Sequence, residues 1–158
     1  MRDMTLDDLK GESGQEHRLT YRDGTQRTIY VVDRETPFPE GKLIVSRTDC
    51  DGIITHANQA FVDMSGYEVS ELIGQPHYIL RHPDMPAVAF KDLWDTCARY
   101  EKWHGYVKNL RKDGTYYWVY ATVVPNRRAG KIVGFTSVRR KPSRSKIAAA
   151  EALYKTLK

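Results

Sequence analysis

Apolar residues gather in five extended stretches after residue 42, and turn-forming residues separate most of these stretches. "LIVSRTD", which begins at Leu43, and "IITHA", which begins at Ile53, flank the hairpin-forming dipeptide Asp51-Gly52. The three later stretches, "WHGYVKNLR", "YYWVYATVVP" and "KIVGFTSVRR", are joined by the glycine-containing turns "KDGT" and "NRRAG". The pattern predicts five antiparallel strands.

Helical features lie between the second and third of these strands. Asn58 stands at an N-cap position before "QAFVDMSGY", in which Gly66 acts as a stop signal. Helical spacing of four apolar residues predicts a longer helix from about Pro86 to Tyr100. These four residues are Phe90, Leu93, Trp94 and Cys97. We therefore expect an α+β fold in which the inserted helices cover one face of a five-stranded antiparallel sheet, with a cavity between the two layers.

The two ends of the chain differ from this central region. Residues 1–36 are polar apart from Ile29 to Val32, and we interpret them as a loosely ordered arm that could carry a short helix or strand. Residues 142–158 predict an amphipathic helix that runs to the end of the sequence, so we expect a longer parent protein. The predicted organisation is an N-terminal arm (1–36), a central domain (37–141) and a C-terminal linker helix (142–158).

Composition fits one globular domain with short extensions, because the 158 residues are 41% hydrophobic and 28% charged. The net charge is +5, and much of the excess lies between Arg139 and Lys146. Short basic runs are usually solvated linkers, and this one alone is too little to predict nucleic-acid binding. Cys50 and Cys97 have no metal-binding spacing, which favours a reducing cytoplasm. No signal peptide is recognisable, and no apolar run approaches the roughly 20 residues that span a membrane.

One polar residue is out of place in the predicted sheet. Counting by twos puts Asn109 on one face with Trp103, Gly105 and Val107, and a three-residue "DGT" loop would place it opposite Val119. The face of Val119 also carries Tyr117, Ala121 and Val123. An amide in such an apolar environment costs about 1–3 kcal/mol unless it is hydrogen-bonded. A heteroaromatic ligand with adjacent donor and acceptor edges would satisfy it; a neighbouring backbone group or a water molecule is the alternative.

The segment "LRHPDMP" is both polar and stiff. It places Arg81, His82 and Asp84 beside two prolines, just before the longer helix. A loop held in this way can present side chains to a charged ligand. The alternative is a local salt-bridged cap, because a carboxylate is favourable near a helix N-terminus.

The sequence offers no catalytic arrangement. We find no nucleophile with a base and an orienting group, no paired carboxylates around a cleft, and no phosphate-binding glycine loop. We therefore expect a binding or signalling protein rather than an enzyme.

Several motifs occur together in a recognisable order. They are "ITHANQAFVDMSGY", "ELIGQPH", "RHPDMP", "AFKDLW", "KWHGYVKN", "KDGTYYWV" and "IAAAEALYK". On these motifs, residues from about Phe38 to Leu157 resemble the flavin-binding PAS domain of bacterial aerotaxis (energy-taxis) receptors. The resemblance implies a PAS sensor domain that binds FAD noncovalently and follows electron transport through the redox state of the flavin.

The resemblance also implies site residues. Arg81, His82 and Asp84 would hold FAD or order its loop, with His77 just upstream, and Asn109 would bond the polar edge of the isoalloxazine. The full predicted cofactor-binding set is Asn58, His77, Arg81, His82, Asp84, Trp94, Trp103, Asn109, Tyr117 and Val119. Asn58 could equally serve as a helix cap, and both tryptophans also fit a core role.

A change in flavin redox state would be passed to partners, which we expect to be a second copy in a homodimer and downstream signalling segments of the parent receptor. Two other PAS functions are consistent with the sequence. A haem-binding gas sensor would use His77 or His82 as an axial ligand, and a ligand-free domain would serve only protein interaction.

In the light-sensing LOV branch of PAS domains, the motif reads Gly-x-Asn-Cys-Arg. Here "GQPH" puts His77 in place of the reactive cysteine, which excludes that photoadduct. That branch commonly has a second Asn across the hairpin, where this chain has Val119.

Overall fold

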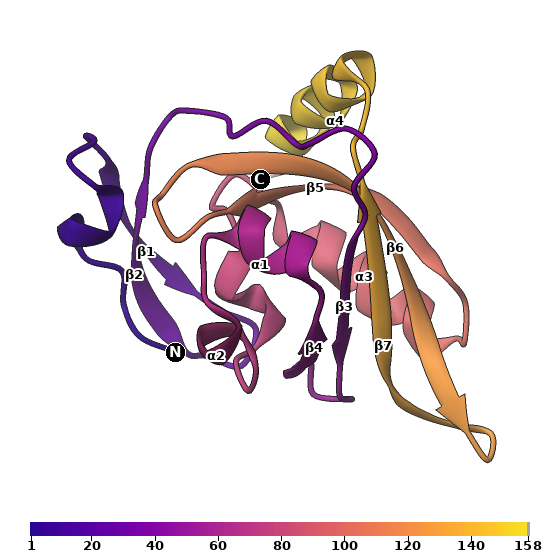
Figure 1. Cartoon of the computed structure of the whole chain (residues 1–158). Coiled ribbons are helices and arrows are strands. Elements are labelled where there is room, and N and C mark those ends of the chain that lie inside the picture. Colours follow the sequence, from indigo (N-terminus) through magenta and orange to yellow (C-terminus); the bar gives the residue numbers. More distant parts are fainter. Residues whose placement is uncertain (158) are drawn as a thin grey trace.

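The computed structural model describes residues 1–157, in which a five-stranded antiparallel sheet carries on one face the helices inserted between its second and third strands (Figure 1). Strand order in the sheet is β4-β3-β7-β6-β5. The elements, in chain order, are η1 (Leu6–Leu9), β1 (Gln15–Thr20), β2 (Gln26–Val31), β3 (Ile44–Thr48), β4 (Ile54–Ala57), α1 (Gln59–Ser65), α2 (Val69–Leu72), η2 (His77–Leu80), α3 (Ala87–Ala98), β5 (Trp103–Leu110), β6 (Tyr116–Arg128), β7 (Lys131–Arg140) and α4 (Arg144–Thr156). The predicted α+β architecture, with its helices inserted between the second and third strands of the sheet, is confirmed.

Asn58 connects the sheet to the first helix. Its side-chain oxygen accepts hydrogen bonds from the backbone N–H of Phe61 and of Val45, each at 3.0 Å, and its Nδ2 donates to the Leu43 carbonyl at 3.0 Å. The predicted N-cap is therefore present, and the same amide also fixes the edge of β3. Gly66 ends α1 with a φ of +77°, a conformation that favours glycine.

The register of the β5–β6 hairpin differs from the expected one. Asn109 lies opposite Tyr117, and Val119 lies opposite Val107. The three-residue loop is Lys112–Gly114 rather than "DGT", because Arg111 donates its N–H to the Thr115 carbonyl at 2.8 Å and Gly114 takes the loop's left-handed position, with a φ of +85°. The expectation that Asn109 faces Val119 is wrong, although both residues remain on the inner face of the sheet.

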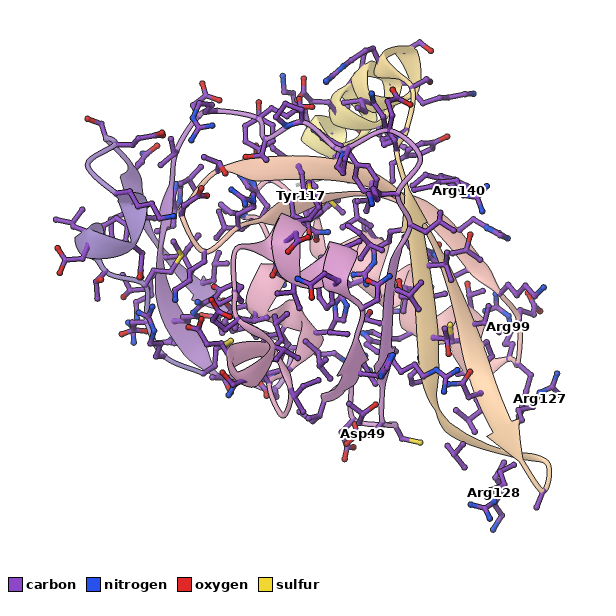
Figure 2. The ribbon with its side chains drawn as sticks, viewed as in Figure 1. Asp49, Arg99, Tyr117, Arg127, Arg128 and Arg140 are labelled. Carbon is purple, nitrogen blue, oxygen red and sulfur yellow. The ribbon has the colours of Figure 1, made fainter. Side chains whose placement is uncertain are left out.

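The main core lies between that inner face and the helices. Seventeen buried residues form it, and Figure 2 shows Tyr117 among the side chains between α1 and the sheet. Members with less than 2% exposure include Ile44, Ile54, Phe61, Leu72, Leu80, Cys97, Tyr117 and Val119.

Residues 1–36 are folded, so the expectation of a loosely ordered arm is wrong. Strands β1 and β2 pair along six residues each, and a separate small core holds this hairpin against the central domain. That core consists of Met4, Leu9, Ile29, Val32 and Leu110. A buried cation completes the attachment: Arg27 donates to the Ile79 carbonyl at 3.0 Å and to the Tyr67 hydroxyl at 3.1 Å. The alternation along β2 was hard to recognise because one of its inward positions is this arginine.

The C-terminal helix α4 packs on the outer face of the sheet. Ile147 and Ala150 are buried against Trp118, and the Tyr154 hydroxyl donates to the Tyr106 carbonyl at 2.6 Å. Leu153, in contrast, is 55% exposed. No helix within residues 1–157 is both long enough and apolar enough to cross a membrane.

Candidate functional site

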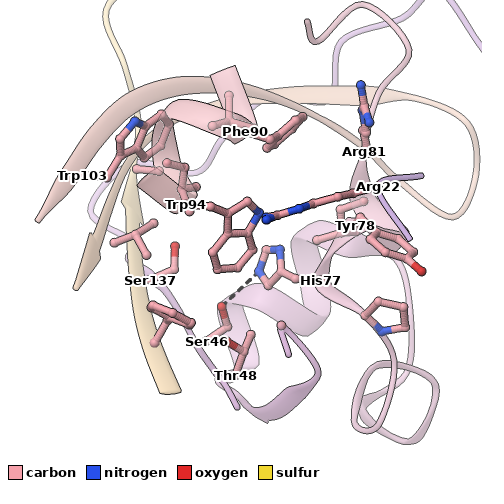
Figure 3. Close-up of a pocket in the computed structure, with 18 of the residues that line it drawn as sticks. Arg22, Ser46, Thr48, His77, Tyr78, Arg81, Phe90, Trp94, Trp103 and Ser137 are labelled. Atoms are coloured by element: carbon pink, nitrogen blue, oxygen red, sulfur yellow. Dashed lines mark hydrogen bonds between the residues drawn. The ribbon is translucent and has the colours of Figure 1, made fainter. Parts of the chain in front are cut away.

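A cavity of about 730 Å³ lies between the inner face of the sheet and the helices (Figure 3). Its walls come from β3, β5, β6 and β7 on one side and from η2 and α3 on the other, and the turn between β1 and β2 lies at its edge. The lining residues that matter below are Tyr21, Arg22, Ser46, His77, Tyr78, Arg81, Phe90, Trp94, Trp103, Val107, Asn109, Ser137 and Arg139. Cavities of this size, with aromatic walls and a few polar groups, are typical of small-molecule and cofactor sites.

Asn109 supplies an amide to the wall of the cavity. It is 5% exposed and shares the inner face of β5 with Val107. Its neighbour across the strands is Tyr117, whose hydroxyl is buried without a well-formed hydrogen bond to residues 1–157. Burial raises the pKa of Tyr117, so this phenol stays protonated at physiological pH. Asn109 provides both a donor and an acceptor to the cavity wall, whereas Tyr117 lies behind it in the core.

Both predicted tryptophans line the cavity. Trp103 is 6% exposed, and its Nε1 donates to the Asp92 carboxylate of α3 at 2.9 Å. Trp94 contacts Phe135 edge to face, with ring centroids 5.2 Å apart. These flat side chains offer stacking surfaces, and the hydrogen bond to Asp92 fixes the orientation of one of them.

The polar loop before α3 divides its side chains between two environments. Arg81 lines the cavity, and its guanidinium carbon lies 5.1 Å from the centre of the Phe90 ring. His82 is buried outside the cavity lining, and its Nδ1 accepts a hydrogen bond from the Asp84 N–H at 3.0 Å. The Asp84 carboxylate accepts from Lys108 Nζ at 2.8 Å. Arg81 therefore faces the cavity, whereas Asp84 anchors the loop to β5 and His82 bonds within the loop.

Five of the ten residues in the predicted set line the cavity: His77, Arg81, Trp94, Trp103 and Asn109. Asn58, His82, Asp84, Tyr117 and Val119 do not, and lie in the capping, loop-anchoring and core positions described above.

Arg139 is a cavity residue that the sequence interpretation missed. The basic run from Arg139 is typical of a solvated linker, yet Arg139 is only 2% exposed, whereas Arg140 points outward (Figure 2). Counting by twos along β7 from Phe135 through Ser137 would have placed Arg139 on the inner face. Its guanidinium donates to Ser46 Oγ at 2.6 Å and lies 4.5 Å from the centre of the Phe61 ring.

His77 is the second basic group of this cluster. Its Nε2 lies 3.3 Å from Ser46 Oγ, the contact drawn in Figure 3, and 3.1 Å from Arg139 Nη1. Burial and then the charge of Arg139 lower the pKa of His77 to about 3, so its imidazole is neutral at physiological pH. Burial lowers the pKa of Arg139 to about 10, which leaves it positively charged. No carboxylate within residues 1–157 forms an ion pair with this guanidinium.

Metal ligation has no support in the part of the chain that the structure describes, since no cluster of three His, Cys, Asp or Glu residues is placed to hold an ion. The cavity thus combines aromatic walls, one amide and the guanidinium groups of Arg81 and Arg139, of which Arg139 is buried. Such a combination suits a flat aromatic molecule that has polar edges and carries negative charge.

The profile of the PAS fold matches residues 54–139, more than half of the chain. The chain belongs to the PAS-fold family. The PAS domain is 50% identical over 128 residues to the aerotaxis receptor of Escherichia coli (strain K12), an alignment that covers 81% of this chain and 25% of the receptor. The resemblance to aerotaxis receptors is therefore confirmed, for a chain that spans about a quarter of that protein's length.

More distant relatives share the domain. The nitrogen fixation regulatory protein of Klebsiella pneumoniae is 29% identical over 90 residues, which cover 57% of this chain and 18% of that protein. The light-state LOV domain of the photoreceptor Aureochrome1 superposes with a TM-score of 0.63 at 22% identity, covering 71% of this chain and 91% of that one. A light-oxygen-voltage domain studied with a flavin analogue gives a TM-score of 0.59 at 27% identity, covering 72% of this chain and 84% of the other. These structures confirm the PAS fold.

Proposed function

We propose that this PAS domain binds FAD in its cavity and acts as the redox-sensing module of an aerotaxis-type signalling receptor. The observation that carries the proposal is the inward-facing Asn109 amide in an aromatic cavity of about 730 Å³. Similarity to the aerotaxis receptor over 81% of the chain supports the same function. Its role is binding and signalling rather than catalysis.

The residues present fit a flavin. An isoalloxazine ring is flat and largely apolar with one polar edge, so Trp94, Trp103 and Phe90 suit its faces and Asn109 suits its edge. Arg139 adds a buried positive charge that favours an electron-rich ligand. FAD, when bound, would supply a ring that gains electrons and protons. Asn109 can form hydrogen bonds with both the oxidised and the protonated, reduced ring, because its amide both donates and accepts hydrogen bonds.

The strand that carries Asn109 also reaches the C-terminal helix. Asn109 faces the cavity, and three residues earlier in β5 the Tyr106 carbonyl accepts the hydrogen bond from Tyr154 of α4. A shift of β5 that follows a change at Asn109 would alter how α4 rests on the outer face. A signal requires that oxidised and reduced FAD differ in their contacts with these residues. If both forms contacted the protein equally, a change of redox state would not shift its conformational equilibrium.

The C-terminal helix α4, which contacts β5, is the surface on which we expect signalling partners to bind. Leu153 on α4 is 55% exposed and offers apolar surface to a second copy of the domain or to downstream segments of the parent receptor. We place this module on the cytoplasmic side of a parent protein that could be membrane-anchored through other segments.

A haem-binding PAS sensor is the second candidate, and the geometry disfavours it. His77 Nε2 already lies 3.1 Å from Arg139 Nη1, so axial ligation through this nitrogen would break that hydrogen bond. His82 is buried outside the cavity lining. A domain without any ligand would leave this large cavity empty and Arg139, its buried cation, without a negatively charged partner.

The visible absorption spectrum of freshly purified protein, followed by chromatography of the chromophore released on denaturation, tests the proposal. We expect a flavin spectrum and FAD in the supernatant, and a redox titration would then give its midpoint potential. A Soret band would indicate haem instead. A colourless protein that also fails to take up added FAD would leave the interaction module and refute the redox function.

A further inference from the structure

The turn between β1 and β2 contributes to the cavity although it lies outside residues 54–139, which the PAS-fold profile matches. This hairpin tip, residues 21–25, is closed by hydrogen bonds from Tyr21 N–H to the Thr25 carbonyl at 2.8 Å and from Gly24 N–H to the Tyr21 carbonyl at 2.9 Å. Tyr21, Arg22 and Asp23 line the cavity. Figure 3 shows the side chain of Arg22 extending toward Trp94.

The hairpin tip is held in place by contacts with η2. Tyr21 stacks on Tyr78, with ring centroids 4.2 Å apart and planes 9° from parallel. The Tyr78 hydroxyl donates to the Asp23 carboxylate at 2.7 Å. Arg27 donates to the Ile79 carbonyl at 3.0 Å and ties β2 to the same short helix. The position of Arg22 is therefore defined relative to η2 and to Arg81, the residue that follows η2.

Two arginines at this edge of the cavity lack a carboxylate partner. Neither Arg22 nor Arg81 forms an ion pair with any acidic residue in positions 1–157. Asp23 instead accepts hydrogen bonds from Tyr78 and from the Thr25 N–H at 2.9 Å. Asp95 pairs with Lys91 at 2.7 Å, and this hydrogen bond is the main reason that its pKa is lowered, with the charge of Arg22 as the smallest contribution.

The two guanidinium groups rest on aromatic rings, with their donors available. Arg22 lies 5.8 Å from the centre of the Trp94 ring, and Arg81 lies 5.1 Å from that of Phe90. The Nε of Arg81 is buried without a hydrogen bond to the described residues, and its Nη2 makes only a long contact of 3.5 Å with the Met85 carbonyl. Burial also lowers the pKa of Arg81, a cost that an anion beside it would relieve.

We propose that Arg22 and Arg81 together bind the pyrophosphate of a flavin dinucleotide, so that the N-terminal hairpin selects FAD over flavins that lack this group. The inference rests on the proposed flavin-binding function and assigns the phosphate-binding residues of that site. Phosphate is the ligand that a planar, always-charged guanidinium binds best, because its donors form parallel charge-assisted hydrogen bonds. Two arginines carried by separate elements suit the two linked phosphates of a dinucleotide.

Titrating the full apo-protein with riboflavin, FMN and FAD at two salt concentrations tests this assignment. Charge-assisted hydrogen bonds to one arginine correspond to about 10-fold or more in affinity. Arg22→Gln should therefore weaken FAD binding about 10-fold while changing riboflavin binding less than about 2-fold, and it should reduce the salt dependence of FAD binding. Arg22→Lys, which keeps the charge, should retain part of the preference. Arg18→Gln is the matched control, because Arg18 lies on β1 of the same hairpin, bonds Thr28 and does not line the cavity.

The outcomes separate this assignment from the proposed function. If the wild-type protein binds none of the three flavins, the proposed function itself fails. If it binds them but the ratio of FAD to riboflavin affinity is the same in Arg22→Gln and wild type, only the pyrophosphate assignment is overturned. Equal weakening of all three flavins, or weaker FAD binding with unchanged salt dependence, also overturns it. Arg81→Gln provides an independent second variant if Arg22→Gln is unstable by thermal unfolding.

Discussion

Nη1 of Arg139 lies 3.1 Å from Nε2 of His77, so two basic side chains share a hydrogen bond inside the cavity. The contact is possible because only one of them is charged. Burial and the neighbouring guanidinium lower the pKa of His77 to about 3, and its neutral imidazole accepts the proton that Arg139 donates. The positive charge of this cluster thus resides on Arg139 and is not balanced by an ion pair with residues 1–157.

This pair predicts that acid destabilises the apo-protein through His77. The pKa of His77 is about 3 in the folded state against 6.5 for an unperturbed histidine, so between these values the unfolded chain binds one more proton. Stability should fall by about 1.4 kcal/mol for each pH unit below about 6.5 from this residue alone. His77→Gln, which can still accept from Arg139, should lose about 2 kcal/mol less than wild type between pH 7 and pH 5.

Urea unfolding of the apo-protein at the two pH values measures this difference. His56→Gln is the control, because His56 is exposed on β4, and we expect it to keep the wild-type pH dependence. A His77→Gln variant with the full wild-type loss at pH 5 would show that other groups cause the acid sensitivity.

Arg139 should raise the midpoint potential of a bound flavin, because a buried positive charge favours the electron-rich reduced ring. We expect Arg139→Gln to lower the potential by at least about 30 mV, which for a two-electron couple corresponds to about 1.4 kcal/mol. Arg139→Lys keeps the charge and should lower it less. Redox titration of the FAD-loaded variants measures the effect, with the exposed Arg140→Gln as control. Equal potentials in wild type and Arg139→Gln would mean that this charge does not act on the ring.

The sequence predicts the sheet and the longer helix because their signals are local. Each signal specifies the conformation of the residues next to it: the hairpin turn at Asp51-Gly52, the helix start at Asn58 and the strands at the period-two runs. These elements all occur as expected. The N-terminal hairpin was missed because its stability comes from contacts with distant residues. Arg27, for example, occupies an inward position only because Ile79 and Tyr67 supply acceptors far along the chain.

The cavity residues also divide into those that local sequence signals predict and those that depend on contacts between distant segments. Asn109 and Trp103 line the cavity, and their place on its wall could be predicted because an amide and an indole on one strand face stand out among small apolar residues. Arg139 was missed because its charge placed it with the basic run that follows, although alternation along β7 points it inward. The contribution of Arg22 could not be predicted at all, because it depends on the docking of the hairpin tip against Tyr78.

Asn109→Ala should weaken the binding of every flavin, in contrast to the selective loss expected of Arg22→Gln. Removing hydrogen bonds to the polar ring edge should cost about 10-fold in affinity for riboflavin and FAD alike. The flavin absorption bands should also shift, because the amide polarises the ring. Asn126→Ala is the matched control: Asn126 lies on β6, bonds Thr136 at 2.9 Å and does not line the cavity. An Asn109→Ala protein with wild-type flavin affinity, absorption spectrum and midpoint potential would show that Asn109 does not bind the flavin.

Gly105→Ala should disturb the cavity through Trp103, although replacing glycine in a strand is ordinarily favourable. A Cβ added at residue 105 would clash with the Trp103 ring, so the indole must move and release Asp92, to which it donates at 2.9 Å. Overpacking of this kind costs about 1–3 kcal/mol. Urea unfolding should show that penalty, and flavin affinity should fall with it.

The double variant Gly105→Ala with Trp103→Leu separates this clash from a backbone effect. Leucine at residue 103 would not fill the space above residue 105, so Gly105→Ala should cost little stability in the Trp103→Leu background. The coupling free energy between the two substitutions should then be about 1 kcal/mol or more. If Gly105→Ala costs the same in both backgrounds, the ring is not what requires glycine at this position. Loss of the alanine penalty in the Trp103→Leu background, together with recovered flavin affinity, would mean that the cavity tolerates leucine at residue 103 but not a displaced indole.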